Sequence, residues 1–455
     1  MKNISKTNKT KDKNYYHSYP RAVALSFLGI IFAGALLLML PISSKGGNVS
    51  FLDALFTATS AGCVTGLVLF DTFSKWTLFG QIVILCLIQV GGLGFITIIT
   101  LFSRFVKKHF SVHEKMLLKE SVGTIYKGDT RNLVKIIIGG TAFFEITGAI
   151  ILSSQFIPKM GLKNGLFTSV FLSISAFCNA GFDVMGRTLP SSSLTTINDR
   201  PVILLTICLL IIVGGIGFIV WEDIIKHKFN FKRYNVHSKL VIVTTAILLF
   251  AGALLYFLFE YNNTLADMPL WQKIINALFC STTARTAGFN SIDNSSLTGI
   301  SKLLTNILML IGGSSGSTAG GIKTTTFAVL FICMISTLRN KKEIEIFGRR
   351  ISSEDLQKAT AIFFINVSEI FISILIITFV QPELSFSDIL FECTSALGTV
   401  GMTTGITPNL ETIPKIVIVL MMYIGRITSL IFAFTLFLKN KPTSTQKPKG
   451  SLLIG

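Results

Sequence analysis

The sequence has few charged residues and few of the side chains on which metal sites and redox enzymes depend. Charged residues make up 14% of its 455 residues, and only five residues are histidine. The seven cysteines are an odd number, and none has the C-x-x-C spacing of a zinc or redox site. We interpret the cysteines as small packing residues. His109 and His113 could share a helix face, but solvated surface in a basic loop explains them better.

Apolar residues, in contrast, are abundant. Half of the residues are hydrophobic, and phenylalanine alone occurs 38 times. Eight apolar runs approach or exceed the roughly 20 residues needed to span a bilayer. They cover residues 22–40, 78–102, 136–156, 202–221, 240–259, 303–338, 359–380 and 416–438. The sequence therefore predicts an all-α integral membrane protein with eight transmembrane helices.

The net charge of +18 is distributed unevenly along the chain. Lys and Arg gather in the N-terminal tail, at the C-terminal end and in the connecting segments 104–135, 226–239 and 339–358. By the positive-inside rule these segments, and both termini, are cytoplasmic. Membrane topology accounts for the basic character, so no nucleic-acid partner is needed to explain it.

Four segments share one pattern, in which an apolar helical stretch meets a hydroxyl residue and a glycine follows six positions later. The pairs are Ser60 and Gly66, Ser175 and Gly181, Thr282 and Gly288, and Ser395 and Gly401. The glycines lie 115, 107 and 113 residues apart, a regularity that predicts four copies of one unit. Each unit has two spans flanking a short pore helix. We divide the chain into a polar tail (1–20), repeats 21–110, 130–228, 236–345 and 352–440, and a C-terminal tail (441–455).

The glycine-ended segments are suited to line an ion pathway with backbone carbonyls. The four lines are Val64-Thr65-Gly66, Asn179-Ala180-Gly181, Thr286-Ala287-Gly288 and Thr399-Val400-Gly401. None contains Asp or Glu, so selectivity would come from carbonyl dipoles, which suit weakly hydrated monovalent cations. A single copy would be an ordinary loop between helices. Four copies, each followed 24 to 33 residues later by a second glycine (Gly91, Gly214, Gly312 and Gly425), are not.

The second span of the third unit differs from the others, which we expect to continue as helices. Its residues 312–326 are rich in Gly, Ser and Thr, which makes a poor helix, and the whole run is too long for one crossing. We predict a flexible loop below the filter that acts as a gate. Gly313 to Gly316 matches a serine-protease pattern, but no histidine lies in a predicted span to act as base. The stretch from Gly316 to Thr324 resembles a phosphate loop with an extra residue, after a membrane helix instead of a strand. We therefore predict no enzyme.

Isolated charges inside the predicted membrane segments are functional candidates by default. Arg426 lies in the middle of the last span, where it would repel cations and set their occupancy below the filter. Its alternative role is a structural pair with Glu145 or Glu369, which occupy similar places in two first spans. Arg285 lies three residues before Gly288, and we expect it to contact carbonyls or acids and not the lumen.

These residues resemble the Trk/Ktr/HKT superfamily of potassium transporters, most closely the Ktr membrane subunits of bacteria. The matching stretches are Cys63-Val-Thr-Gly-Leu67, Cys178-Asn-Ala-Gly-Phe182, Arg285-Thr-Ala-Gly-Phe-Asn290, Gly398-Thr-Val-Gly-Met402, the glycine-rich loop and Gly425-Arg426. The resemblance implies four pseudo-fourfold repeats around one pore, a homodimer and potassium uptake that sodium often stimulates. A glycine at Gly66 would go with potassium preference. The implied gate is Gly312, Gly313, Ser314, Ser315, Gly316, Ser317, Thr318, Gly320, Gly321, Lys323 and Arg426.

The resemblance also implies a partner that this chain does not contain. Its cytoplasmic segments are too short for a nucleotide-binding domain, so a separate cytosolic regulatory subunit of the RCK/KTN type would bind ATP or ADP and act on the gate. The expected location is the bacterial cytoplasmic membrane. Two alternatives stay open: obligatory sodium–potassium symport through the same fold, and a membrane sensor or scaffold that transports nothing.

Overall fold

The computed structural model describes residues 24–94, 130–187, 189–190, 192–228, 230–341 and 343–427. The predicted tails 1–20 and 441–455, the histidines His109 and His113, most of the basic segment 104–135 and the end of the last span lie outside these residues.

Helices make up most of the described chain. The longer helices are Ala24–Met39, α2 (Phe51–Gly62), α4 (Leu78–Leu93), α7 (Thr130–Phe177), α8 (Pro201–Ile216), α9 (Phe218–His227), α10 (Val236–Glu260), α11 (Leu270–Thr283), α12 (Gly299–Leu310), α13 (Thr324–Leu338), α14 (Ser353–Val380), α15 (Phe386–Gly398) and α16 (Thr412–Ile427). The short ones are α3 (Thr72–Lys75), η1 (Pro41–Ser43), η2 (Met185–Arg187), η3 (Thr195–Ile197), η4 (Phe231–Arg233) and η5 (Thr407–Asn409). The strands β1 (Glu345–Ile346) and β2 (Arg349–Arg350) form one antiparallel hairpin.

Local sequence sets where the short helices of the glycine-ended segments begin. Ser50 accepts a hydrogen bond from the Asp53 amide at the start of α2, and Ser385 does the same for Asp388 at α15. A hydroxyl N-cap followed by an acid in the first turn satisfies orphan amides and complements the helix dipole. In the second unit the outer helix and the short helix are joined in α7, where Gly161, at φ 76°, marks the kink between them.

The number of membrane spans is only partly visible in the described residues. Three helical segments there, Leu133–Phe177, α10 and α14, are long and apolar enough to cross a membrane. A fourth results if α8 and α9 count as one bent span. The other apolar helices are shorter, because several predicted spans run into undescribed residues or are interrupted by loops. The total of eight spans stays a prediction.

The second span of the second unit is not one helix. We predicted residues 202–221 as continuous, but α8 ends at Ile216 and α9 leaves it at 94°. Gly217 makes the bend at φ 100°, in the left-handed region that favours glycine. The expectation that only the third unit is interrupted was therefore wrong.

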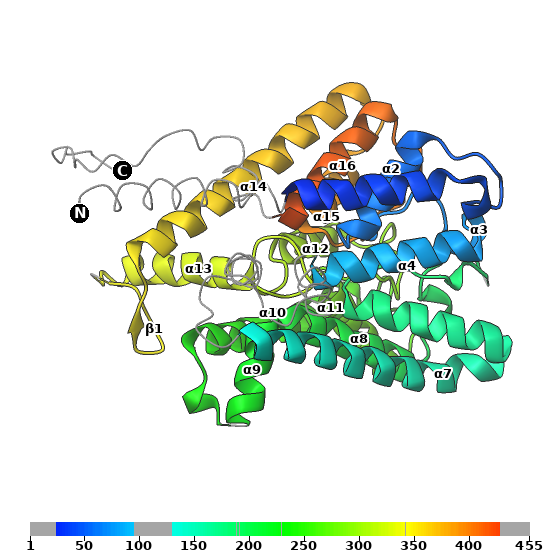
Figure 1. Ribbon diagram of the computed structural model, residues 1–455. Helices are drawn as coiled ribbons and strands as arrows, with labels where there is room; N and C mark the ends of the chain where they lie inside the picture. The colour runs from blue at the N-terminus through cyan, green and yellow to red at the C-terminus, as the bar shows by residue number, and fades with distance from the viewer. Residues whose placement is uncertain are drawn as a thin grey trace, which may run out of the picture.

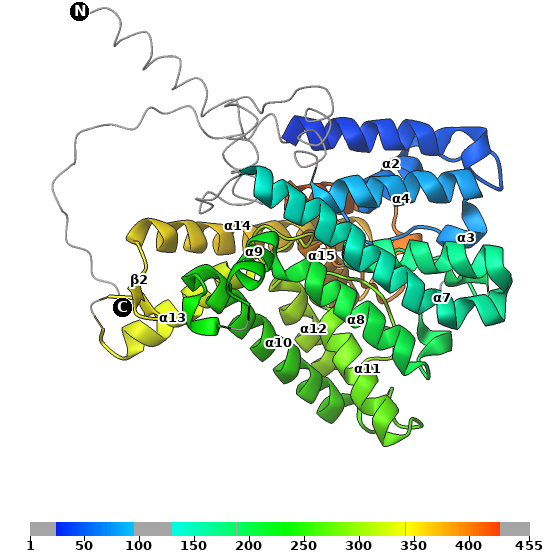
Figure 2. The ribbon, with the colours of Figure 1, turned by 60° about the horizontal axis from the view of Figure 1, so that its bottom comes forward.

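The units follow one another around a centre. Figure 2 shows α8 between α7 on one side and α11 with α12 on the other, and α12 in turn packs against α15. The described chain closes on itself, because α16 packs against α2 and the orange-red last unit lies beside the blue first unit (Figure 1). The Tyr423 hydroxyl donates to the Ala24 carbonyl at 2.8 Å, and Lys415 pairs with Asp53 at 3.0 Å. This circular order brings the ends of α2, α7, α11 and α15 together.

Candidate functional site

The four predicted filter glycines lie in mutual contact. A Cβ added to any one of them would collide with the carbonyl oxygen of the residue before the next glycine. The pairs are Gly66 with Ala180 (2.5 Å), Gly181 with Ala287 (2.7 Å), Gly288 with Val400, and Gly401 with Thr65. The contacts run from the first unit through the fourth and back to the first. The predicted filter lines therefore meet in one closed ring of backbone.

The four lines share a pattern of positive φ angles. Each glycine has a positive φ, and so does the non-glycine residue two positions before it. These residues are Val64 (58°), Asn179 (59°), Thr286 (92°) and Thr399 (50°). A left-handed conformation costs an L-residue about 1–2 kcal/mol, and such strain concentrates at functional sites. The four segments thus share one uncommon pattern of backbone dihedrals.

Hydroxyl groups hold the filter lines to the helices that precede them. The Gly66 and Gly401 amides donate to the hydroxyls of Ser60 and Ser395, both at 3.0 Å. In the second unit Ser175 donates instead to the carbonyl of Phe182 at 2.7 Å. In the first, second and fourth units, the hydroxyl six positions before the glycine is thus a buried clamp on the extended return of the chain.

The third unit is offset by one residue from this pattern. We singled out Thr282, but its hydroxyl donates to the Leu278 carbonyl within α11 at 2.7 Å. Thr283 makes the clamp, donating to the Phe289 carbonyl at 2.8 Å. Both residues are threonine, so the spacing alone pointed to the wrong member of the pair.

The second set of glycines permits close contact between helices. A Cβ at Gly91 would collide with the carbonyl of Gly62, at the C-terminal end of α2. Gly214 meets Phe177 in the same way, and Gly425 meets Leu397. Only glycine lets each second helix approach the C-terminal end of its own short helix this closely. Gly312 of the third unit is different, because it packs against Gly320 within its own loop.

The predicted gate loop lies between α12 and α13, with its two ends tied together. Ile311 pairs with Ile322, and the Thr324 amide donates to the Gly313 carbonyl at 3.1 Å. The Ser314 and Thr324 hydroxyls lie 3.1 Å apart. Residues 324–326, which we included in the loop, belong to α13. The hydroxyl-rich sequence therefore encodes a loop whose ends are joined by hydrogen bonds.

The loop forms hydrogen bonds with the bent region of the second unit. The Ser314 amide donates to the Gly215 carbonyl at 3.0 Å, and the Phe218 amide donates to the Gly316 carbonyl at 2.8 Å. The Thr318 hydroxyl donates to the carbonyl of Phe177 at 3.2 Å. Breaking the helix at Gly217 frees backbone groups that a continuous helix would bond internally, and the loop satisfies them.

Arg426 connects the loop to two other units. Its guanidinium donates to the Thr318 carbonyl of the loop and to the Gly91 carbonyl at the end of α4. In the described part of the chain it makes no ion pair with Glu145, whose carboxylate accepts from Gln89 at 3.0 Å. The fork of an arginine can bind two carbonyls at once, and Arg426 uses it to link the fourth unit, the first unit and the loop.

The far end of the loop lies against the fourth filter line. A Cβ at Gly320 would collide with the Thr399 side chain, and Gly321 lies close to Gly398. Lys323 donates to the Ala319 carbonyl at 2.8 Å within the loop. The loop therefore extends from the second unit to the fourth, against the ends of the short helices.

Two ion pairs around the ring were not among our predictions. Lys302 of α12 lies 3.4 Å from Asp388, and Lys415 of α16 pairs with Asp53. In both cases a lysine early in one unit's second helix meets the acid in the first turn of the next unit's short helix. The Ser-x-x-Asp pattern at the start of these two short helices marks the acid, but its lysine partner comes from another unit and therefore leaves no local pattern in the sequence.

Beyond the second filter line lies an acid that we did not single out. Asp183 is half-buried, and one of its carboxylate oxygens accepts from the Met185 amide at 2.9 Å. Burial raises the pKa of Asp183 to about 6; the Met185 amide opposes this shift, and the Asp71 carboxylate adds to it.

Comparison with known proteins agrees with this architecture. A family model for TrkH, described as a cation transport protein, matches residues 3–443. The potassium/sodium uptake protein NtpJ of Enterococcus hirae is 39% identical over 440 residues, which is 95% of this chain and 96% of that protein. The Ktr system potassium uptake protein B of Bacillus subtilis is 40% identical and covers 96% of each chain.

Among solved structures, the potassium transporter TrkH from Vibrio parahaemolyticus has the same fold. It superposes with a TM-score of 0.72 at 17% identity, covering 92% of this chain and 84% of that one. The helical architecture and the matches define a membrane transporter of cations. The chain belongs to the TrkH family, a family of transporters and not of enzymes.

Proposed function

We propose that this protein takes up potassium as the ion-translocating subunit of a Ktr-type system, by channel-like permeation through a backbone filter. The observation that carries the proposal is the closed ring of Gly66, Gly181, Gly288 and Gly401. Two relatives are named as uptake proteins for potassium, one of them also for sodium. Passage needs no chemical step, because the membrane potential contributes about 2.3 kcal/mol per charge per 100 mV.

The proposed filter consists of the four predicted lines, and its ligands are their carbonyl oxygens. Carbonyls replace the hydration shell of an ion without a fixed negative charge, which favours a weakly hydrated monovalent cation. The clamps from Ser60, Ser175, Thr283 and Ser395 hold these carbonyls in place before an ion arrives. Preorganisation of this kind avoids the cost of ordering ligands on binding.

The proposed gate is the loop 312–323 with Arg426. In support of this role, the loop contacts the second unit, the fourth filter line and the Arg426 guanidinium, which also binds the first unit. Deleting residues 316–320 removes most of these contacts. We expect the deletion to leave a cation flux that no longer depends on a regulator, and a deletion variant with fully regulated flux would refute the gate.

Five further features belong to the proposal. The protein is a homodimer in the bacterial cytoplasmic membrane, with both termini cytoplasmic. A cytosolic subunit of the RCK/KTN type binds ATP or ADP and acts on the gate loop. Sodium stimulates the flux without being transported obligatorily. The word "system" in the Bacillus subtilis relative's name supports a separate partner subunit.

Cation uptake into liposomes that hold the purified protein tests the proposal. We expect potassium flux in sodium-free buffer. Obligatory symport is the second candidate, favoured by the potassium/sodium name of the Enterococcus hirae relative. It predicts no potassium flux until sodium is added. Absence of flux in every buffer would refute transport and favour a sensor or scaffold.

A further inference from the structure

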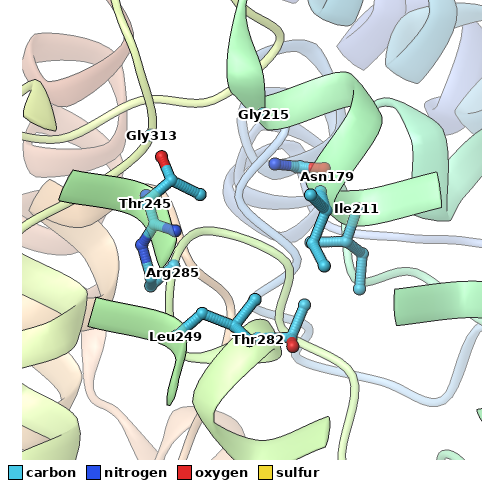
Figure 3. A pocket seen from close by; sticks show the side chains of 9 residues that line it. Asn179, Ile211, Gly215, Thr245, Leu249, Thr282, Arg285 and Gly313 are labelled. Carbon is cyan, nitrogen blue, oxygen red and sulfur yellow. The ribbon is translucent and has the colours of Figure 1, made fainter. Parts of the chain in front are cut away.

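A small cavity lined by both polar and apolar side chains lies behind the proposed filter, between the second and third units. It has a volume of about 20 Å³, and α8, α10, the end of α11 and the first residues of the gate loop surround it. Figure 3 shows Arg285 and Thr245 approaching it from one side, with Asn179 and Ile211 on the other. Gly313 of the loop also lines it. A cavity of this size has room for one water molecule.

Two of the polar groups at this cavity lack a protein partner. The Thr245 hydroxyl and the Arg285 Nε are buried without a hydrogen bond, and both residues are more than nine-tenths buried. The Arg285 Nη2 lies 3.5 Å from the Gly312 carbonyl, at the outer limit for such a bond. None of the ion pairs in the described part of the chain includes Arg285. The Arg285 guanidinium, which has five N–H donors, therefore has one distant acceptor, the Gly312 carbonyl.

A buried polar group without a partner is destabilising, and a buried cation more so. One water molecule would relieve both groups, because it can accept from the guanidinium and exchange a hydrogen bond with the hydroxyl. A space of single-water size excludes a polyatomic anion such as sulfate or phosphate, which leaves chloride as the competing occupant. The Asn179 side chain does not serve as the missing partner of these groups, since its amide lies 3.0 Å from the Thr286 hydroxyl.

We propose that this cavity holds one ordered water that joins Arg285 to Thr245, and that Arg285 is thereby a positioning residue for the start of the gate loop. The water ties the guanidinium to α10, the rigid outer helix of the third unit. The guanidinium then faces Gly312, the first residue of the loop, while Gly313 closes the cavity. The gating consequence rests on the proposed function, whereas the water site itself does not.

The test replaces Thr245 in the full-length protein. Thr245→Val keeps the volume and removes the hydroxyl, and Thr245→Ser keeps the hydroxyl. Thr206→Val is the matched control, because Thr206 is also a buried membrane-helix threonine, but its hydroxyl donates to Val202 in its own helix at 2.6 Å. The primary measurement is amide hydrogen exchange of residues 312–318, which does not depend on transport.

We expect Thr245→Val to speed exchange in this segment about fivefold, equivalent to the roughly 1 kcal/mol of one hydrogen bond. Thr245→Ser and Thr206→Val should stay near wild type. Arg285→Lys, which has no planar fork, should speed exchange at least as much. Unregulated potassium flux should rise in the same variants. Wild-type liposomes without any flux would sink the proposed function, yet the exchange data would still decide the water site.

Two outcomes overturn the inference. Exchange in Thr245→Val equal to that in Thr206→Val would mean that the hydroxyl holds nothing. Exchange that slows when chloride replaces gluconate in the buffer would assign the site to an anion instead of water. Unchanged exchange in the two buffers, together with the Thr245→Val effect, supports the water.

Discussion

Replacing Gly66 by serine introduces a side chain into the filter ring at a position where even a Cβ does not fit. The new Cβ would lie 2.5 Å from the Ala180 carbonyl oxygen, whereas ordinary contact begins at 3.4 Å. Relief requires that this carbonyl, which belongs to the neighbouring unit, move by about 0.9 Å. Gly66 also has φ 96°, so the serine carries an additional strain of about 1–2 kcal/mol.

A displaced carbonyl no longer holds the ion at the distance set by the other three lines. If the discrimination between potassium and sodium loses about 1.4 kcal/mol, roughly one hydrogen bond to a charged group, the permeability ratio falls about tenfold. We therefore expect Gly66→Ser to admit sodium. The assay is competitive uptake of potassium and sodium into liposomes at equal gradients.

The matched control is Gly405→Ser. Gly405 has φ 100°, but no atom lies within 4 Å of an added Cβ, so this variant has the backbone strain without the collision. It should keep the wild-type ion ratio. If Gly66→Ser folds with an unchanged ratio, or if Gly405→Ser changes it equally, the reasoning from carbonyl contact is wrong.

Three further predictions concern the gate and the outer side. Arg426→Gln cannot bind the Thr318 and Gly91 carbonyls with a charged fork, so unregulated flux should rise at least about tenfold in liposomes, whereas an unchanged flux would contradict the gate role. Gly217 has φ 100°, and Gly217→Ala places a Cβ 2.9 Å from the Ser315 carbonyl oxygen, so this variant should speed hydrogen exchange in α9. Exchange identical to that of the wild type would contradict this prediction. Burial raises the pKa of Asp183 to about 6, so the folded state binds this proton more tightly than the unfolded chain and is destabilised as pH rises from about 4 to 6. Asp183→Asn should therefore raise the melting temperature at pH 7 and flatten its dependence on pH in that window; equal melting curves would refute this.

The closed ring is formed by Gly66, Gly181, Gly288 and Gly401, the glycines that the repeated sequence pattern identified. A hydroxyl residue, a fixed spacing and a glycine are visible in any one unit, and the clamp between Ser60 and Gly66 needs nothing outside its own segment. The four repeats then predict a common centre. The pattern failed at Thr282 because its neighbour Thr283 has the same chemistry, and only the backbone decides which hydroxyl faces the return of the chain.

The bend at Gly217 could not be predicted in this way. The sequence around Gly214, Gly215 and Gly217 nearly repeats that around Gly91, Gly92 and Gly94, and both stretches lie in continuous apolar runs. At the bend, the backbone of the loop from the third unit forms hydrogen bonds with Gly215 and Phe218. A contact over about a hundred residues leaves no periodic signal. The same holds for Arg426, which donates to carbonyls of two other units.

The loop of the third unit contacts the second and fourth units, and Arg426 links it to the first. The second unit bends at Gly217 and bonds the loop backbone, the fourth contributes Arg426, and the first offers the Gly91 carbonyl. The differences between the repeats are therefore connected. A substitution in any of these receiving positions should disturb the loop even though none belongs to it.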